Sequence, residues 1–402
     1  MSYFILITLC CIVLIAYFFE ITSKFSKIPS VILILCLGML LRFITTNIGF
    51  SIPDLSMLLP LMGTLGLILI VLEGSMDLNL GSDKKKLILK SFSSAFLLFF
   101  VFIITFSLIM HFGYGFSFKM ALLNAIPFGI ISSAVAIPSS ISLHKNDREF
   151  IVYESSVSDI VGILLFDFVL FNQMSLINGM MIFSMEVFAT IIFSVIISIG
   201  LAYMLHKIGH HIKYVIILTS VVLIFTLAKI VHWPSLIVVL IFGLTLNNNH
   251  LFQNRYTLKY IDFNDFNSNL KSFKQITGEL TFLVRSFFFL IFGYYTSLEG
   301  LFNFQTLLFS ISIITTVFGL RALFFKFVIR KSLTPLLFFA PRGLITILLF
   351  LSIPAQLKLP FMTEGLIAQI IIISIIVMAF GNIITSHQKD VLEPTNTNIN
   401  NE

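Results

Sequence analysis

Charged residues are scarce in this chain, since Asp, Glu, Lys and Arg together make up 11% of its 402 residues. Hydrophobic residues make up 58%, and the mean hydropathy is +1.03. A typical soluble domain carries about 25% charged residues, so this composition excludes the soluble globular class. The sequence therefore predicts an all-α polytopic membrane protein.

Cysteines and catalytic motifs are scarce as well. Cys10, Cys11 and Cys36 lie in apolar stretches without paired spacing, which argues against a disulfide framework or a zinc site. The chain has no HExxH or GxSxG string, and no histidine falls at mid-membrane depth in the spans expected below. We therefore do not expect an intramembrane enzyme, and we expect no cofactor.

Apolar runs near 20 residues in length predict about thirteen membrane spans. The first of them lacks a basic n-region and a small-residue cleavage site, so it is expected to be a retained helix and not a signal peptide. The stretch 247–269 is the one long polar connection, and 386–402 is expected to be a disordered cytoplasmic tail. The expected spans are 3–22, 29–46, 55–76, 88–112, 117–142, 149–172, 179–205, 213–230, 233–246, 270–297, 304–329, 334–354 and 364–385.

The basic residues predict the orientation of these spans. Most of the 25 Lys and Arg residues fall in alternate loops, whereas the opposite side keeps Arg42, Lys119, Lys229 and Lys358. The positive-inside rule then puts the N-terminus outside and the C-terminus in the cytoplasm, which agrees with an odd number of spans. Because the basic residues are dispersed through short loops, the net charge of +6 does not indicate a nucleic-acid partner.

Two spans contain helix-breaking residues at membrane depth. The fifth has Pro127 and Pro138 on either side of Ser132 and Ser133, and the twelfth has Pro341 followed by Gly343. A proline inside a helix frees the carbonyl four residues earlier, so Pro138 frees that of Ala134. At membrane depth, freed backbone groups are tolerated only where protein or a water-filled cavity satisfies them.

The two interrupted spans are seven spans apart, which indicates an internal repeat. Interrupted helices at corresponding positions of two halves are typical of inverted-repeat transporters. This spacing predicts six-helix repeats at 3–172 and 213–385, joined by a linker helix at 179–205. Ordinary proline kinks are the alternative interpretation, and the acidic sixth span argues against it.

The sixth span, 149–172, is mostly apolar but carries Glu154, Ser155, Ser158 and Asp159 in its middle part. A carboxylate at the middle of a membrane helix costs about 2.5 to 3.5 kcal/mol, so such residues tend to face an interior or a water cavity and handle ions or protons. Ser155 and Asp159 share one helix face, whereas Glu154 and Ser158 share another. The alternative for such a carboxylate is a structural ion pair.

Glu154 needs a cationic partner if it is buried, and bidentate pairing with a guanidinium is the most favourable solution. Arg321 is the first candidate and Arg342 the second. Arg285 has a local alternative in Glu279, a little over one and a half turns earlier on the same helix.

Five motifs together resemble the monovalent cation/proton antiporters of the NhaP and NHE type. They are LEGSMDL around Glu73, SSAVAIP, ESSVSD, GLRALFF and PRGLITILLFLSIP. The resemblance covers nearly the whole chain with the motifs in the right order. It implies an NhaA-like fold with crossed discontinuous helices, a homodimer, and exchange of Na+ or Li+ for H+ across a bacterial inner membrane.

The resemblance also implies roles for individual residues. Asp159 would bind a proton and a sodium ion alternately, and Glu73, Ser155 and Ser132 would complete the coordination together with Ser133. Glu154 and Arg321 would form a structural brace, and Ser158, Arg342 and Arg285 would support the site. Ser158 stands where the family has Asn, and Ser133 stands where many members have Asp. The SSAVA string is closer to the Kef-type branch, so K+/H+ exchange stays open, as does a cation channel.

Proton and cation compete for a buried carboxylate, because burial disfavours its charged form and a bound cation favours it. If the empty carboxylate cannot cross the membrane unneutralised, each crossing carries one or the other. A single titrating Asp159 then predicts one-for-one exchange, which a membrane potential cannot drive.

Overall fold

The computed structural model describes residues 2–26, 29–49, 57–81, 84–171, 176–207, 212–231, 233–248, 263–329 and 334–392. Within these residues all regular structure is helical, which confirms the prediction of an all-α fold. The elements are α1 (Ser2–Ser26), α2 (Ser30–Ile48), α3 (Leu58–Asp77), α4 (Lys85–Leu108), η2 (Ile109–Gly113), α5 (Phe118–Gly129), α6 (Ser133–Ser139), α7 (Lys145–Phe171), α8 (Leu176–Lys207), α9 (Lys213–Ile230), α10 (Ser235–Asn247), α11 (Phe263–Tyr295), α12 (Leu298–Leu301), α13 (Phe304–Phe324), η5 (Phe325–Ile329), α14 (Leu344–Ser352), η6 (Ala355–Leu357) and α15 (Glu364–Leu392).

The helices support a chain that crosses the membrane many times. In the part of the chain that the structure describes, nine helices are long and apolar enough to span a bilayer, and Cys10–Ser23 and Ser235–Asn247 are shorter apolar helices. Each expected range overlaps a helix or a pair of helical segments. The total of thirteen crossings itself stays a prediction.

Two expected boundaries differ from the structure. Helix α11 begins at Phe263, so its first residues belong to a helix and not to the polar connection expected up to residue 269. Helix α15 continues to Leu392, so the tail expected from residue 386 is helical up to that point. The apolar run ends earlier than the helix because helical hydrogen bonds do not require an apolar sequence. Residues 249–262 and 393–402 lie outside the described part.

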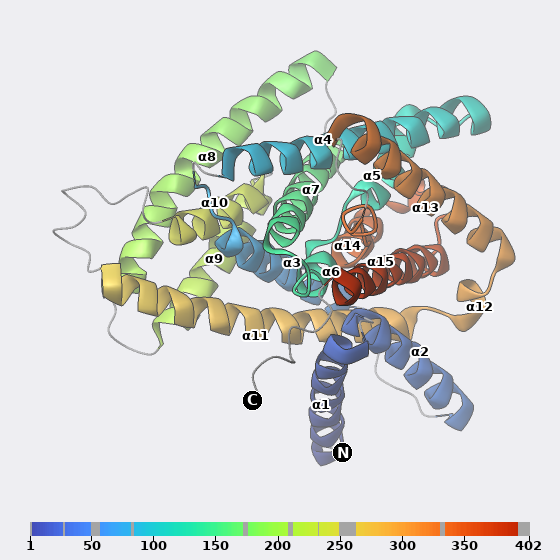
Figure 1. Ribbon diagram of the computed structural model, residues 1–402, viewed down its shortest axis with the longest axis horizontal. Coiled ribbons are helices and arrows are strands. Elements are labelled where there is room, and N and C mark those ends of the chain that lie inside the picture. The colour runs from blue at the N-terminus through green and yellow to red at the C-terminus, as the bar shows by residue number, and fades with distance from the viewer. Residues whose placement is uncertain are drawn as a thin grey trace, which may run out of the picture.

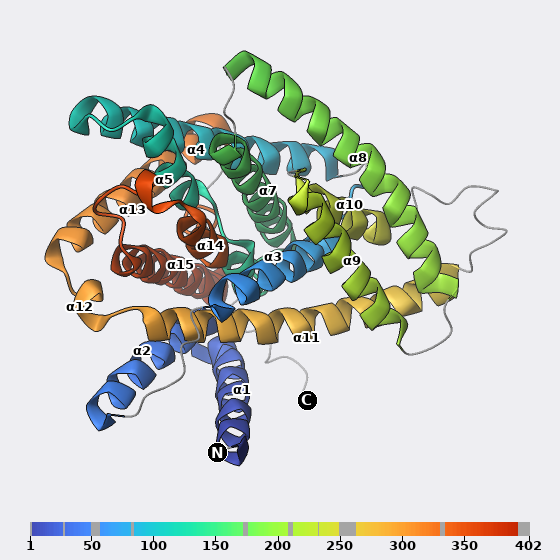
Figure 2. The same cartoon turned by 180° about the vertical axis from the view of Figure 1, so that it is seen from behind.

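The molecule has two flanks and a centre. Figures 1 and 2 both show α8, α9 and α10 at one end of the long axis and α12 and α13 at the other, with α3, α6, α7, α14 and α15 between them. The long helix α11 runs along one side and packs against α2 and α3. Helix α7 packs against α4, α5 and α6, so the acidic centre of the sixth span lies among other helices.

Helices α2 and α11 approach each other through glycine. A Cβ atom on Gly38 would lie 2.2 Å from the Leu290 carbonyl oxygen, and one on Gly293 would lie 2.3 Å from the Leu35 carbonyl oxygen. Only glycine fits at such backbone contacts. Small residues are common at helix interfaces in membranes because they allow this approach, so α2 is held directly against α11.

The two expected breaks are present, and they cross. The fifth span is interrupted between α5 and α6, and residues 339–343 form a non-helical segment before α14. The Ser132 amide donates to the Pro341 carbonyl at 2.9 Å, and the Thr346 hydroxyl donates to the Pro127 carbonyl at 3.0 Å. A Cβ atom on Gly343 would lie 2.4 Å from Ser132 Oγ, so glycine permits the crossing. The prediction of crossed discontinuous helices is confirmed.

Candidate functional site

The site centres on α7, where Glu154, Ser155, Ser158 and Asp159 are each no more than 1% exposed. Ser158 Oγ accepts a hydrogen bond from the Ile131 amide at 3.0 Å. Asp159 is held by Ser133, two residues further along the same interrupted segment. The middle of α7 is therefore bonded directly to the break between α5 and α6.

Asp159 uses only one of its carboxylate oxygens. Its Oδ2 accepts hydrogen bonds from the Ser133 amide, at 3.2 Å, and from the Ser133 hydroxyl. Its Oδ1 is buried and has no hydrogen-bond partner among the described residues. The Ser132 hydroxyl, at the crossing, is likewise buried and unpartnered within that part of the chain. Buried polar atoms are normally satisfied, so these two oxygens keep acceptor capacity for a ligand.

The other expected ligands, Ser155 on α7 and Glu73 on α3, have different neighbours. Ser155 Oγ donates to the Ile151 carbonyl of its own helix at 2.7 Å, which leaves its lone pairs available. Glu73 on α3 faces α11, where a Cβ atom on Gly278 would lie 3.4 Å from Glu73 Oε1 and Thr281 and Arg285 are its neighbours. The contacts found for Glu73 therefore do not bring it to Asp159.

Helix α3 meets α7 through a serine that sequence reasoning missed. A Cβ atom on Gly74 would lie 3.2 Å from Ser156 Oγ, and that hydroxyl is buried without a partner among the described residues. Ser156 precedes Asp159 by three residues, so the helical spacing places both on neighbouring parts of one face. This three-residue spacing in the sequence could have identified Ser156 as a residue of the site.

The expected ion pair between Glu154 and Arg321 is present and bidentate. Arg321 Nη1 and Nη2 donate to the two carboxylate oxygens at 2.7 and 2.6 Å, and Arg321 Nε donates to the Leu336 carbonyl at 3.0 Å. Ser94 of α4, which sequence reasoning did not identify, also donates to Glu154. Both charged side chains are 1% exposed, so the pair links α7 to α13 deep inside the protein.

Arg342 and Arg285 bind backbone at the two breaks. Arg342 Nη1 donates to the Ala340 carbonyl at 3.0 Å, and its amide donates to Ser374 Oγ at 2.9 Å. Arg285 Nη1 donates at 2.9 Å to the Ala134 carbonyl, the oxygen that Pro138 was expected to free. Arginine side chains thus satisfy backbone groups at membrane depth, as such breaks require.

The expected local partner of Arg285 is wrong. Its Nη2 lies 3.7 Å from Glu20 Oε2 on α1, whereas Glu279 accepts from the Gln275 side chain at 3.3 Å. Residues six apart on a helix are about 240° apart around its axis, so Glu279 and Arg285 point to different sides. Glu279 is close to Arg285 in the sequence, but the large angle between them around the helix axis prevents a contact.

These features define a class of protein. An all-helical membrane protein in which a buried, half-satisfied carboxylate lies beside two crossed helix breaks is a transporter of small ions.

Among the described residues, no group of three or more His, Cys, Asp or Glu side chains could hold a metal ion.

The comparisons with known proteins identify the family. The chain belongs to the sodium/hydrogen exchanger family, because the family model "Sodium/hydrogen exchanger, transmembrane" matches residues 10–387. The family is one of cation/proton antiporters, as the sequence motifs indicated. The sequence has no match among curated proteins.

The fold is similar to that of a solved antiporter. The structure at pH 8 of the sodium proton antiporter MjNhaP1 from Methanocaldococcus jannaschii matches with a TM-score of 0.70 and 20% sequence identity over 98% of each chain. An electron-microscopy map of the same antiporter matches with a TM-score of 0.68 and 19% sequence identity over 100% of each chain. The NhaP-type fold is thereby confirmed.

Proposed function

We propose that this protein exchanges Na+ or Li+ for H+, one for one, by competition of cation and proton for Asp159. One observation supports this most directly. Asp159 Oδ1 is a buried carboxylate oxygen without a partner among the described residues, and it belongs to a side chain bonded to the crossing of two broken helices. A proton or a cation would satisfy that oxygen, and both cannot do so at once.

The surrounding residues favour an exchange of ligands at this oxygen. Ser133 donates to Oδ2 and stabilises the charged carboxylate, which a cation requires, whereas burial favours the protonated form. We propose that Ser132, Ser133 and Ser155 supply further oxygen ligands. Glu73 faces α11 and does not reach Asp159 in this structure, so we do not include it in this ligand set.

The one-for-one ratio follows from the partners of the acidic residues. Glu154 is already neutralised by Arg321, and Ser158 stands beside Asp159 where a second acid would titrate. Asp159 then carries either a proton or a monovalent cation through the membrane, so the charge moved is the same in each direction. Net charge transfer per cycle is zero.

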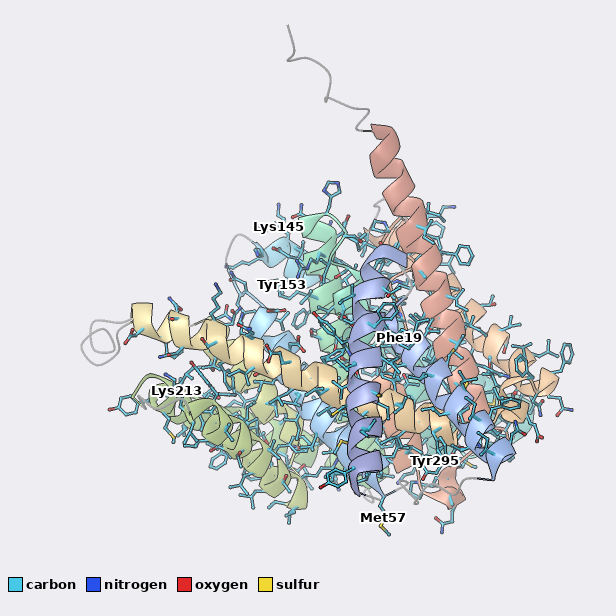
Figure 3. All side chains as sticks on the ribbon, turned by 90° about the horizontal axis from the view of Figure 1, so that it is seen from below. Phe19, Met57, Lys145, Tyr153, Lys213 and Tyr295 are labelled. Atoms are coloured by element: carbon cyan, nitrogen blue, oxygen red, sulfur yellow. The ribbon has the colours of Figure 1, made fainter. Side chains whose placement is uncertain are left out.

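We propose a homodimer in a bacterial inner membrane, with the N-terminus outside and the C-terminus in the cytoplasm. Figure 3 shows Lys145 toward one end of the molecule and Met57 and Tyr295 toward the other. The alternate-loop assignment puts these residues on opposite sides, which supports that topology. The repeats 3–172 and 213–385 and the linker 179–205 are proposed on the same basis.

Transport by the purified protein in liposomes tests the function. With an imposed pH gradient and a trapped pH dye, Na+ or Li+ should dissipate the gradient, and Asp159→Asn should abolish this. Asp167→Asn, eight residues later on the same helix, is the matched control and should keep transport. Exchange by Asp159→Asn at the wild-type rate would contradict the mechanism. A response to K+ alone would instead assign the K+/H+ alternative, and cation flux without proton flux would indicate a channel.

A further inference from the structure

We propose that a small monovalent anion, chloride in the cell, binds in a small, partly open cavity between Arg321 and Arg342. The cavity has a volume of about 20 Å³ and lies beneath α4 and α13, next to both helix breaks. Apolar side chains that include Leu98, Ile131 and Val317 form most of its wall. Arg321 and Arg342 supply its charged lining. This site is separate from Asp159 and goes beyond the exchange of cations and protons.

Arg342 lacks a carboxylate partner among the described residues. Its side chain is 2% exposed, and its contacts are with the Ala340 carbonyl on the side chain and the Ser374 hydroxyl on the backbone. Its Nε is buried and unpartnered in the described part of the chain. Glu154, the nearby carboxylate, is bound by both terminal nitrogens of Arg321.

Charge balance favours an anion in this position. Arg321 and Glu154 neutralise each other, and Asp159 with its proton or its cation is neutral overall, so Arg342 leaves one positive charge at membrane depth. A buried charge is costly unless it is paired. An anion against Arg342 would complete the pairing in both states of the transport cycle.

The lining also distinguishes an anion from water. A guanidinium has only hydrogen-bond donors, and the apolar side chains of the wall add no acceptor, which leaves the backbone of Gly129 and Ala340 as the acceptor-bearing part of the lining. A water molecule needs acceptors for its two hydrogens as well as donors for its oxygen, whereas an anion needs donors only. The side chains of this cavity therefore suit an anion better than water.

The cavity volume restricts the anion to a small one. One water-sized probe occupies about 10 to 15 Å³ on this measure, so the cavity holds a single small particle. Chloride and bromide are monatomic and come nearest to this size, whereas gluconate and sulfate are too large. The ability of an anion to stabilise the protein should therefore depend on its size.

Thermal melting of the purified full-length protein tests this selectivity. At constant Na+ and constant ionic strength, replacing gluconate by chloride or bromide should raise the melting temperature saturably, because a ligand of the folded state stabilises it. Arg342→Gln should lose the dependence on chloride. Arg285→Gln, which removes a buried arginine that faces Glu20 and not this cavity, should keep it. Equal melting in gluconate and chloride for the wild type would overturn the proposal.

A second measurement decides the question without any variant. Crystals of the wild-type protein grown in bromide should show an anomalous difference peak between Arg321 and Arg342. Density there without an anomalous signal would mean an ordered water, and no density would mean an empty cavity. Either result would overturn the proposal even if Arg342→Gln failed to fold.

Discussion

At the scale of single residues, Asp159 and Glu154 differ in their partners although both are buried on α7. Glu154 is bound on both oxygens by Arg321 and receives a further bond from Ser94, so it has little capacity for another ligand. Asp159 has a serine on one oxygen and no partner among the described residues on the other. Glu154 and Asp159 are only five residues apart, yet Glu154 suits a structural role and Asp159 suits the binding and release of an ion.

The Glu154 and Arg321 pair gives a prediction for stability. Arg321→Ala should lower the free energy of unfolding by about 3 to 5 kcal/mol, because it leaves a buried carboxylate unpaired, and the double variant with Glu154→Ala should lose less than the two single losses combined. Thermal melts in detergent of the two single variants and the double variant close the cycle. Additive losses would show that the residues do not stabilise each other.

Residue partners were predictable from the sequence where only one chemical solution existed. A buried carboxylate such as Glu154 is most favourably paired with a guanidinium, and this made Arg321 the first candidate and Arg342 the second. The role of Ser94 was not predictable, because a serine in an apolar helix usually bonds to its own backbone. The partner of Arg285 was missed because Glu20 is distant in sequence, and only the tertiary packing of α1 brings it near.

At the scale of elements, the crossing of the two broken helices positions the site. The proline positions predicted both breaks and the freed Ala134 carbonyl. They did not predict which backbone groups would meet, because the bonds from Ser132 to Pro341 and from Thr346 to Pro127 depend on how separate helices pack.

Gly343 tests the importance of the crossing. Gly343→Ala should destabilise the protein by about 1 to 3 kcal/mol by overpacking, since the new Cβ would lie 2.4 Å from Ser132 Oγ, and transport should fall with it. Gly319→Ala on α13 is the matched control, because nothing lies within 4 Å of its Cβ position. The control should keep wild-type melting and transport. If the two variants behaved alike, the crossing would not be the tight contact described here.

At the scale of the whole molecule, we predict that transport moves no net charge. With one exchanging carboxylate, a membrane potential imposed by K+ and valinomycin should leave the Na+/H+ exchange rate in liposomes unchanged. If net charge moved, each elementary charge would contribute about 2.3 kcal/mol per 100 mV, enough for a severalfold change in rate. A rate that changed with the sign of the potential would show that a second charged group moves, and Glu73 would be the first residue to test.

The release of protons on cation binding tests the central claim most directly. Na+ added to the detergent-purified protein in weakly buffered solution should acidify it by up to one proton per chain, because the cation favours the charged form of Asp159 and displaces its proton. Choline added at the same concentration should release none, and neither should Na+ added to Asp159→Asn. Equal release from the wild type and Asp159→Asn would contradict competition of the two ions at this residue.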